Sequence, residues 1–170
     1  MTIGHSNRPV EELVELLKAN GVALLADVRS MPRSRHNPQF NRETLPETLE
    51  EEGIGYVHLP ELGGMRRPRP DSTNTGWQNA SFRGYADYMQ TAEFEAALEN
   101  LARLDGERRV AVMCAEAVPW RCHRSLISDA LTARGVRVTH ILSMGSNRAH
   151  ELTSFARVAD GRVDYPGLFI

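Results

Sequence analysis

Short apolar runs alternate along the chain with longer segments whose apolar residues recur every three or four positions. The run VALLADV at residues 22–28 is continuous and of strand length, as expected for a buried strand. Residues 9–20, just before it, repeat their apolar positions at helical spacing, between Pro9 at the start and Gly21 at the end. The pattern therefore predicts a helix followed by a buried strand.

The same alternation continues to about residue 143. It predicts, in order, a short strand at 2–6, a helix at 9–20, a strand at 22–28, an acidic helix at 43–52, a strand at 54–59, one or two helices at 82–104, a strand at 108–114, a helix at 122–135 and a last strand at 136–143. Strands separated by helices form βαβ units. We therefore expect an α/β domain, a three-layer open parallel or mostly parallel sheet with helices on both faces.

Length and composition limit the number of domains and the cellular compartment. A chain of 170 residues is expected to form a single domain, residues 1–170, with a short C-terminal extension at about 150–170. No apolar run approaches the ~18 residues of a membrane span, and the first residues do not resemble a signal peptide. With two cysteines and a formal net charge of −2, we expect a cytoplasmic protein without a disulfide framework.

Polar side chains gather where the predicted strands end, which is where open α/β sheets bind ligands. They are His5, Ser6, Asn7 and Arg8 after the first strand; Asp27, Arg29, Ser30, Arg33, Arg35 and His36 after the second; His58, Glu61, Arg66, Arg67 and Arg69 after the third; and Cys114, Glu116, Arg121, Cys122, His123 and Arg124 after the fourth. The alternative is that these loops are polar only because loops generally are.

Charge is segregated in the same way, because the predicted helices carry most of the glutamates and the loops carry the arginines. The chain has a single lysine, Lys18. The planar guanidinium group of arginine makes bidentate contacts with phosphate, sulfate or carboxylate that a lysine ammonium group does not make. We expect an anionic substrate in this crevice. The residues predicted to bind it are His5, Ser6, Asn7, Asp27, Arg29, Arg33, Arg35, Arg121 and Arg124.

The segment from Cys114 to Arg124 holds both cysteines of the chain. Cys122 lies near the first turn of the predicted helix, where the partial positive charge of the helix and nearby arginines lower a thiol pKa. The predicted catalytic residues are Cys114, Glu116, Cys122 and His123, with either cysteine as nucleophile and Glu116 or a histidine as proton-transfer partner.

A strand, a cysteine, a loop and an arginine before a helix form the layout of rhodanese sulfurtransferases and cysteine phosphatases. Here Arg121 follows Cys114 by seven residues, and the loop contains Pro119 and Trp120 but no glycine. A proline removes one of the N–H donors that such an anion cradle needs. The similarity is therefore one of layout.

Two other roles for these cysteines stay open. Cys114, Cys122 and His123 could join His5, His36 or His58 in a tetrahedral metal site, although no C-x-x-C pair is present. In the structural alternative, Cys114 is a buried core thiol, and Cys122 with His123 caps the helix.

Two long loops combine arginines with aromatic residues. RSMPRSRHNPQFN, residues 29–41, contains Phe40, and GGMRRPRPDSTNTGWQNASFRGY, residues 63–85, contains Trp77, Phe82 and Tyr85. Such loops suit stacking on the bases of a nucleic acid, or lids over an anionic substrate. Alternatively, the aromatic side chains anchor the loops to the core.

The segments TIGHSN, LLADVRSMPRSRHNPQFN, YVHLPELGG, FRGYADYM, CAEAVPWRCHRSLISDAL and DYP together resemble the bacterial and archaeal family known as domain of unknown function 488. By that resemblance the motif positions are His5, Ser6, Asn7, Asp27, Arg29, Pro32, Ser34, Cys114, Glu116, Cys122, His123 and Arg124. The resemblance implies an α/β domain and supplies no reaction.

Three hypotheses follow from the sequence. The first, which we favour, is an enzyme acting on a phosphorylated or other anionic substrate through a cysteine. The second is a nucleic-acid-associated binding domain, and the third is a metal-binding protein that uses Cys and His ligands. The cofactor, the substrate and the oligomeric state are left open by the sequence.

Overall fold

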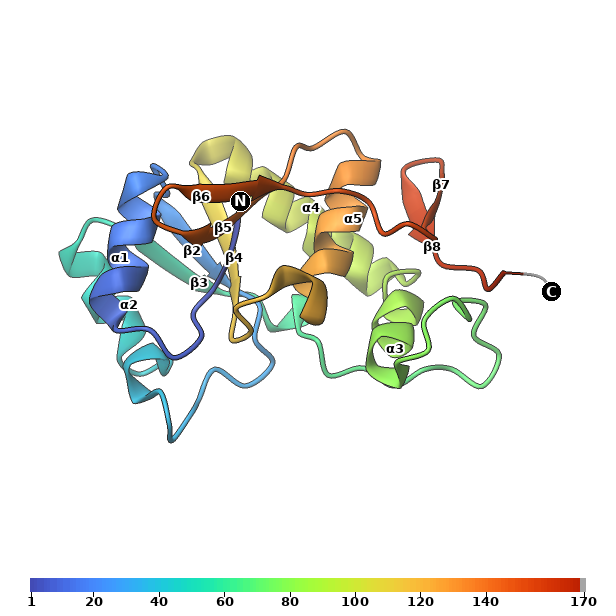
Figure 1. The fold of residues 1–170 in the computed structure, drawn as a ribbon, viewed down its shortest axis with the longest axis horizontal. Helices are drawn as coiled ribbons and strands as arrows, with labels where there is room; N and C mark the ends of the chain where they lie inside the picture. Colours follow the sequence, from blue (N-terminus) through green and yellow to red (C-terminus); the bar gives the residue numbers. More distant parts are fainter. Residues whose placement is uncertain (169–170) are drawn as a thin grey trace.

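A computed structural model describes residues 1–168, in which a six-stranded sheet lies between two groups of helices (Figure 1). The sheet contains β1 (Thr2–Gly4), β2 (Leu24–Asp27), β3 (Gly55–His58), β4 (Val110–Cys114), β5 (Thr139–Ser143) and β6 (Ser146–Ala149), in the order β3-β2-β4-β1-β5-β6. All neighbouring pairs are parallel except β5 and β6. The predicted α/β fold with a mostly parallel sheet is confirmed.

The helices cover both faces of the sheet. Helices α1 (Val10–Ala19) and α2 (Leu45–Glu51) pack on one face, and α3 (Ala80–Tyr88), α4 (Ala92–Glu107) and α5 (Arg124–Ala133) belong to the layer on the other. The buried strands supply both cores by alternation. In β2, Leu25 faces the α1 side while Leu24 and Ala26 face the α5 side.

The register of the parallel strands aligns the ends that carry the polar loops. Gly4 pairs with Cys114, and Asp27 lies beside both Met113 and His58. The residues that leave β1, β2, β3 and β4 therefore start from the same edge of the sheet. This edge is where the candidate site is built.

Helix ends explain why residues 82–104 form two helices. Asn79 accepts hydrogen bonds from the backbone N–H groups of Ser81 and Phe82 at the start of α3. Thr91 accepts one from Phe94 N at the start of α4. The two side-chain caps mark two separate beginnings.

Strand β6 was not predicted. After β5 the chain turns through Gly145, which has a positive φ of 70°, and returns as an antiparallel edge strand. Its sequence SNRA is polar and every residue is exposed, so it has no apolar alternation. The expectation of a last strand at 136–143 was therefore wrong in leaving out the edge strand that follows.

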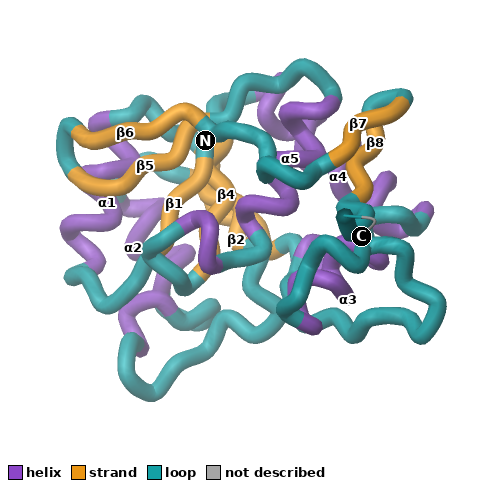
Figure 2. Tube along the Cα trace, turned by 45° about the vertical axis from the view of Figure 1, so that its right-hand side comes forward, coloured by secondary structure: helices purple, strands orange, loops and turns teal. Residues whose placement is uncertain are grey.

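The C-terminal extension forms a two-stranded hairpin of β7 (Arg157–Ala159) and β8 (Arg162–Asp164) beside α5 (Figure 2). Val163 and Tyr165 are buried against the core on the α5 side. Within residues 1–168, no helix has the length and apolar character needed to cross a membrane.

Candidate functional site

Two adjoining hollows open at the carboxyl ends of β1, β2 and β4. Hollow A, of about 470 Å³, is lined by Arg29, Ser30, Met31, Gly64, Met65, Asn79, Ser81, Phe82, Cys114, Ala115, Glu116, Arg121, Cys122 and His123. Hollow B, also of about 470 Å³, is lined by His5, Ser6, Asn7, Arg29, Met31, Arg33, Ser34, Asn37, Ala115, Glu116 and Ala117. The hollows share Arg29, Met31, Ala115 and Glu116. The strand exits therefore meet in one crevice with two compartments.

The two cysteines lie side by side in the wall of hollow A. Cys114 is the last residue of β4, and Cys122 follows the single 3-10 turn at Pro119–Arg121, two residues before α5. Their Sγ atoms are 2.7 Å apart, and both side chains are buried. The turn that begins at Pro119 folds the loop back and so brings the second thiol to the first.

The environment makes the two thiols unequal. Cys122 Sγ lies 3.5 Å from His123 Nδ1 and accepts a 3.5 Å contact from the backbone N–H of Arg124. The hydrogen bond from the Cys114 thiol, with further help from His123, lowers the pKa of Cys122. Burial and the adjacent Cys122 sulfur raise the pKa of Cys114. These opposite shifts favour Cys122 as the thiolate and Cys114 as the thiol that keeps its proton.

His123 is held with one ring nitrogen toward the sulfur. Its Nε2 lies 3.3 Å from the carbonyl oxygen of Val28, which can only accept, so Nε2 carries a proton. Tyr85 packs on the ring with centroids 5.2 Å apart, and a Cβ at Gly64 would lie 2.6 Å from Nδ1. Nδ1 is therefore free to exchange a proton with Cys122. Gly64 was not singled out in the sequence, although the GG pair at 63–64 was visible.

Arg124 has a different role from the predicted one. Its side chain is buried, and its guanidinium donates to Thr2 Oγ1 at 3.2 Å and to Glu116 O at 2.7 Å. A weaker contact of 3.4 Å reaches Ala117 O. These bonds fix the backbone of the cysteine loop, and Arg124 lines neither hollow.

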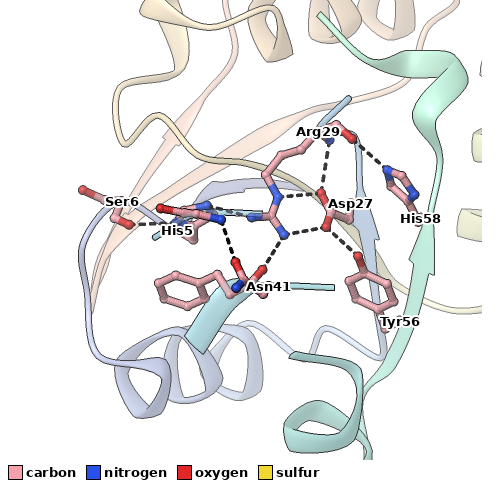
Figure 3. Close-up of polar contacts among 9 residues, drawn as sticks. His5, Ser6, Asp27, Arg29, Asn41, Tyr56 and His58 are labelled. Atoms are coloured by element: carbon pink, nitrogen blue, oxygen red, sulfur yellow. Dashed lines mark hydrogen bonds and ion pairs between the residues drawn. The ribbon is translucent and has the colours of Figure 1, made fainter. Parts of the chain in front are cut away.

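Arg29 is likewise occupied by protein groups, as Figure 3 shows. It makes a two-pronged contact with the buried Asp27, Nε to Oδ1 at 2.9 Å and Nη2 to Oδ2 at 2.7 Å. Nη2 also donates to Phe40 O at 2.6 Å, and Tyr56 donates its hydroxyl to Asp27 Oδ2 at 2.6 Å. The charge of Arg29 is therefore balanced by Asp27, and its contact with His5 joins the β1 and β2 exits.

His5 completes this network as a neutral ring. Its Nδ1 donates to Ser6 O at 2.7 Å and its Nε2 accepts from Arg29 Nη1 at 3.1 Å. The ring stacks on Phe40 with centroids 4.4 Å apart. Burial, together with the Arg29 charge, lowers the pKa of His5 to about 4. His5 is therefore placed to hold Arg29 and to line hollow B.

The remaining predicted residues differ in access. Glu116 and Arg121 are exposed and line hollow A, while Asn7, Ser6 and Arg33 line hollow B. Arg35 is exposed and lines neither hollow. Arg121 and Arg33 are the arginines of the predicted set that are both exposed and part of the crevice lining.

The motif residues Pro32 and Ser34 shape the loop after β2. Pro32 is buried and its carbonyl accepts from Arg42 N at 2.9 Å. Ser34 Oγ accepts from the backbone N–H groups of His36 and Asn37. Both residues thus hold the backbone that presents Arg33.

The aromatic residues of the two long loops anchor them to the core. Phe40 and Tyr85 are buried, and Tyr85 donates its hydroxyl to Leu62 O at 2.8 Å. Trp77 packs on Phe82 and on Tyr165, with ring centroids 4.9 and 5.4 Å apart. Phe40 and Tyr85 are therefore closed to stacking on a base.

A buried hydrogen-bonded chain, the relay, lies outside the predicted site residues. Arg124 donates to Thr2, Thr2 Oγ1 to His140 Nδ1 at 2.6 Å, His140 Nε2 to His150 Nδ1 at 2.9 Å, and His150 Nε2 to Asp129 Oδ1 at 2.8 Å. Burial, reinforced by His150, lowers the pKa of His140 to about 3. The signal available was Asp129, a charged residue on the apolar face of α5.

A metal centre built from these residues has no support in their arrangement. Within residues 1–168, no group of three His, Cys, Asp or Glu side chains is placed to hold a metal ion. His58, one of the predicted ligands, instead donates from Nε2 to Arg29 O at 2.7 Å.

Comparison with known proteins gives one match. The model of a family described as domain of unknown function DUF488 matches residues 9–131, which include the β2 exit, the cysteine loop and most of α5. Among curated proteins and among solved structures, none matches the chain.

Proposed function

The chain belongs to the family of domain of unknown function DUF488, and we propose that it is an enzyme acting on an anionic substrate in hollow A, with Cys122 as nucleophile. The observation that carries the proposal is the set of groups around Cys122 Sγ. The Cys114 thiol, His123 Nδ1 and the backbone N–H of Arg124 all lie within 3.5 Å of this sulfur, in the wall of an open hollow.

The arrangement supplies the parts of a nucleophilic site. His123 Nδ1 takes the proton of Cys122 and, as an imidazolium, donates back to the thiolate. Glu116 is exposed in the same hollow, where its carboxyl group can exchange a proton with a leaving group. The substrate class is a phosphorylated, sulfated or carboxylated small molecule.

Arg121 is the proposed ligand of the substrate anion. It is exposed at the rim of hollow A, one residue before the nucleophile. Arg29 and Arg124 support the site without offering a free guanidinium, because Asp27 and the loop carbonyls hold them. Hollow B, with Arg33 and Asn7, would take the remainder of a larger substrate. The proposal places the protein in the cytoplasm, where reduced thiols persist.

The test compares two alkylating reagents that differ in charge. Iodoacetate is anionic and iodoacetamide is neutral, so the ratio of their rates at Cys122 reports anion attraction independently of thiol reactivity. We expect Arg121→Gln to lower this ratio about threefold to tenfold, on the order of 1 kcal/mol of lost electrostatic attraction. The matched control is Arg35→Gln, which removes an arginine outside both hollows.

Peptide mapping by mass spectrometry assigns the label to Cys122 or Cys114. Equal ratios in Arg121→Gln, Arg35→Gln and the unchanged protein would remove the anion site. Absence of labelling at Cys122, in protein shown to be folded, would remove the nucleophile.

A further inference from the structure

We propose that Cys114 is the resolving thiol for Cys122, so that the protein reduces anionic low-molecular-weight disulfides through an intramolecular Cys114–Cys122 disulfide. The proposal rests on the proposed function, because it takes Cys122 as the nucleophile of hollow A. It adds a second catalytic residue and the chemical class of the substrate.

The contact between the sulfur atoms is the primary observation. The Sγ atoms of Cys114 and Cys122 are 2.7 Å apart, and a disulfide bond measures ~2.04 Å. No side chain separates them, and bond formation needs a movement of less than about 1 Å. If residue 114 only donated a hydrogen bond to a nucleophile, a serine hydroxyl would serve as well as the Cys114 thiol. Two sulfur atoms in contact can also exchange electrons.

The backbone holds the pair in this arrangement before any substrate arrives. Cys114 is the end of β4, in register with Gly4, so its position is that of the sheet. The returning loop is fixed by Arg124, which donates to Glu116 O at 2.7 Å. A Cβ at Gly4 would lie 1.9 Å from the same Glu116 oxygen, so the loop packs directly on β1. The thiols are therefore preorganised for intramolecular attack.

The reduction takes two successive thiol–disulfide exchange steps, and the difference in pKa between the two thiols suits their order. The first attack needs a thiolate, and Cys122 Sγ accepts from the backbone N–H of Arg124 and lies within 3.5 Å of the Cys114 sulfur and His123 Nδ1. The second attack needs a thiol that keeps its proton until the first bond has formed. Part of what raises the pKa of Cys114 is the neighbouring Cys122 sulfur. Once Cys122 is in a mixed disulfide it no longer carries that charge, and Cys114 loses its proton more easily.

The reaction balances as follows. The Cys122 thiolate attacks one sulfur of a substrate disulfide RS–SR, forming Cys122–S–SR and releasing RS⁻, which takes a proton from the imidazolium of His123. Cys114 then loses its proton to water in hollow A and attacks Cys122 Sγ, releasing the second RS⁻, which is protonated. One disulfide is reduced to two thiols while the protein dithiol is oxidised to a disulfide. An external thiol reductant restores the dithiol.

The exposed Arg121, at the rim of a hollow that also contains Glu116, is the group that favours a disulfide carrying carboxylates. Arg121 is exposed beside Cys122, and the backbone N–H of Arg124 faces the same sulfur. Hollow A is also lined by the exposed Met31 and Met65, which can contact an aliphatic substrate body. Oxidised glutathione, a peptide disulfide with several carboxylates, is therefore the probe for the test.

The test treats reduced protein with oxidised glutathione, quenches with an alkylating reagent and measures the intact mass. The unchanged protein is expected to form the internal disulfide and release two glutathione thiols per protein. Cys114→Ser is expected to accumulate the Cys122–glutathione mixed disulfide at least about tenfold above the unchanged protein, because the resolving attack is lost. The matched variant Cys122→Ser should form neither product.

Every other outcome overturns the role given to Cys114, the role given to Cys122, or both. Equal amounts of mixed disulfide in the unchanged protein and in Cys114→Ser would overturn the resolving role and leave the Cys122 nucleophile standing. No glutathione on Cys122 in either protein would overturn both proposals. Glutathione on Cys114 of Cys122→Ser would reverse the assigned order. The ratio of two thiols per protein is measured on the unchanged chain, so the test holds even where a variant fails to fold.

Discussion

Arginines that look alike in the sequence have two kinds of role at the strand exits. Arg29 and Arg124 are buried, and their guanidinium groups hold Asp27 and the carbonyls of the cysteine loop. Arg121 and Arg33 are exposed at the hollows and face solvent. Replacing a buried arginine leaves Asp27 or a loop carbonyl without its donor, which is costly. We therefore expect substitutions of the first pair to act on folding and those of the second pair to act on binding.

The neutral His5 ring makes stability depend on pH. The pKa of His5 is about 4 in the folded protein, below the ordinary 6.5, because the ring is buried beside Arg29. Between pH 6.5 and pH 4 the His5 ring is protonated in the unfolded chain but neutral in the folded protein. The contribution of the neutral ring to the unfolding free energy is therefore fully present above pH 6.5 and is lost as the pH falls toward 4. His5→Asn keeps a donor for Ser6 O and does not titrate. In this variant the decrease in unfolding free energy on acidification should be smaller by on the order of 2 kcal/mol.

Urea unfolding at pH 7.5 and at pH 5 measures the effect. The decrease in unfolding free energy between the two pH values should be smaller in His5→Asn than in the unchanged protein. His140 has a lowered pKa as well, so part of the decrease should remain. An unaltered decrease would show that His5 is protonated as easily in the folded state as in the unfolded chain.

At the scale of elements, the segment after β3 is packed against the start of α5. The glycine pair at 63–64 follows the 3-10 turn Pro60–Leu62, and Gly64 lies against the His123 ring. A Cβ there would lie 2.6 Å from Nδ1 and 2.8 Å from the ring carbon Cγ. The loop after β3 thus sets the position of a side chain that belongs to α5.

Gly64→Ala should move the His123 ring away from Cys122. Because His123 helps to lower the pKa of Cys122, the midpoint of the pH profile for Cys122 alkylation should rise by about one unit. The matched control is Gly106→Ala in α4, where an added Cβ meets nothing within 4 Å. It should leave the profile unchanged and raise the unfolding free energy by roughly 0.5–1 kcal/mol. The same shift in both variants would contradict the role given to Gly64.

Local pattern predicted the elements better than the contacts between them. The apolar run at 22–28 and the helical repeat at 9–20 are properties of neighbouring residues, and both appear in the structure. The meeting of the strand exits was predictable because parallel strands end at one edge. The pairing of Arg29 with Asp27, and the closing of the loop by Arg124, depend on side-chain rotamers and burial. No periodicity in the sequence reports those.

At the scale of the whole molecule, Asp129 of α5 joins the sheet to the C-terminal segment. Its buried carboxylate accepts from His150 Nε2, from Thr153 N and Oγ1, and from Tyr165 OH, all at 2.7–3.0 Å. Through His150 and the relay the same carboxylate is connected to β5, β1 and Arg124. Residues 150–165 are thereby tied to the helix that begins beside the candidate nucleophile.

Asp129→Asn should lower the unfolding free energy by about 3 kcal/mol, because an amide cannot accept from all four donors in a buried setting. The matched control is Asp160→Asn at the exposed turn between β7 and β8, where φ is 52° and asparagine is well tolerated. That change should stay within about 0.5 kcal/mol. Urea unfolding compares the two. Equal changes in unfolding free energy would mean that the buried carboxylate of Asp129 stabilises the fold no more than the exposed carboxylate of Asp160.

The place of β1 in the sheet has a consequence for biosynthesis. Thr2 pairs with Val112 and His140, so the first strand of the chain finds both of its neighbours only after most of the chain has left the ribosome. Such long sequence separation slows folding. The loop between Cys114 and Cys122 packs on β1, and its clamp Arg124 bonds to Thr2. Until β1 has joined β4 during or after translation, the loop between Cys114 and Cys122 lacks the strand on which it packs.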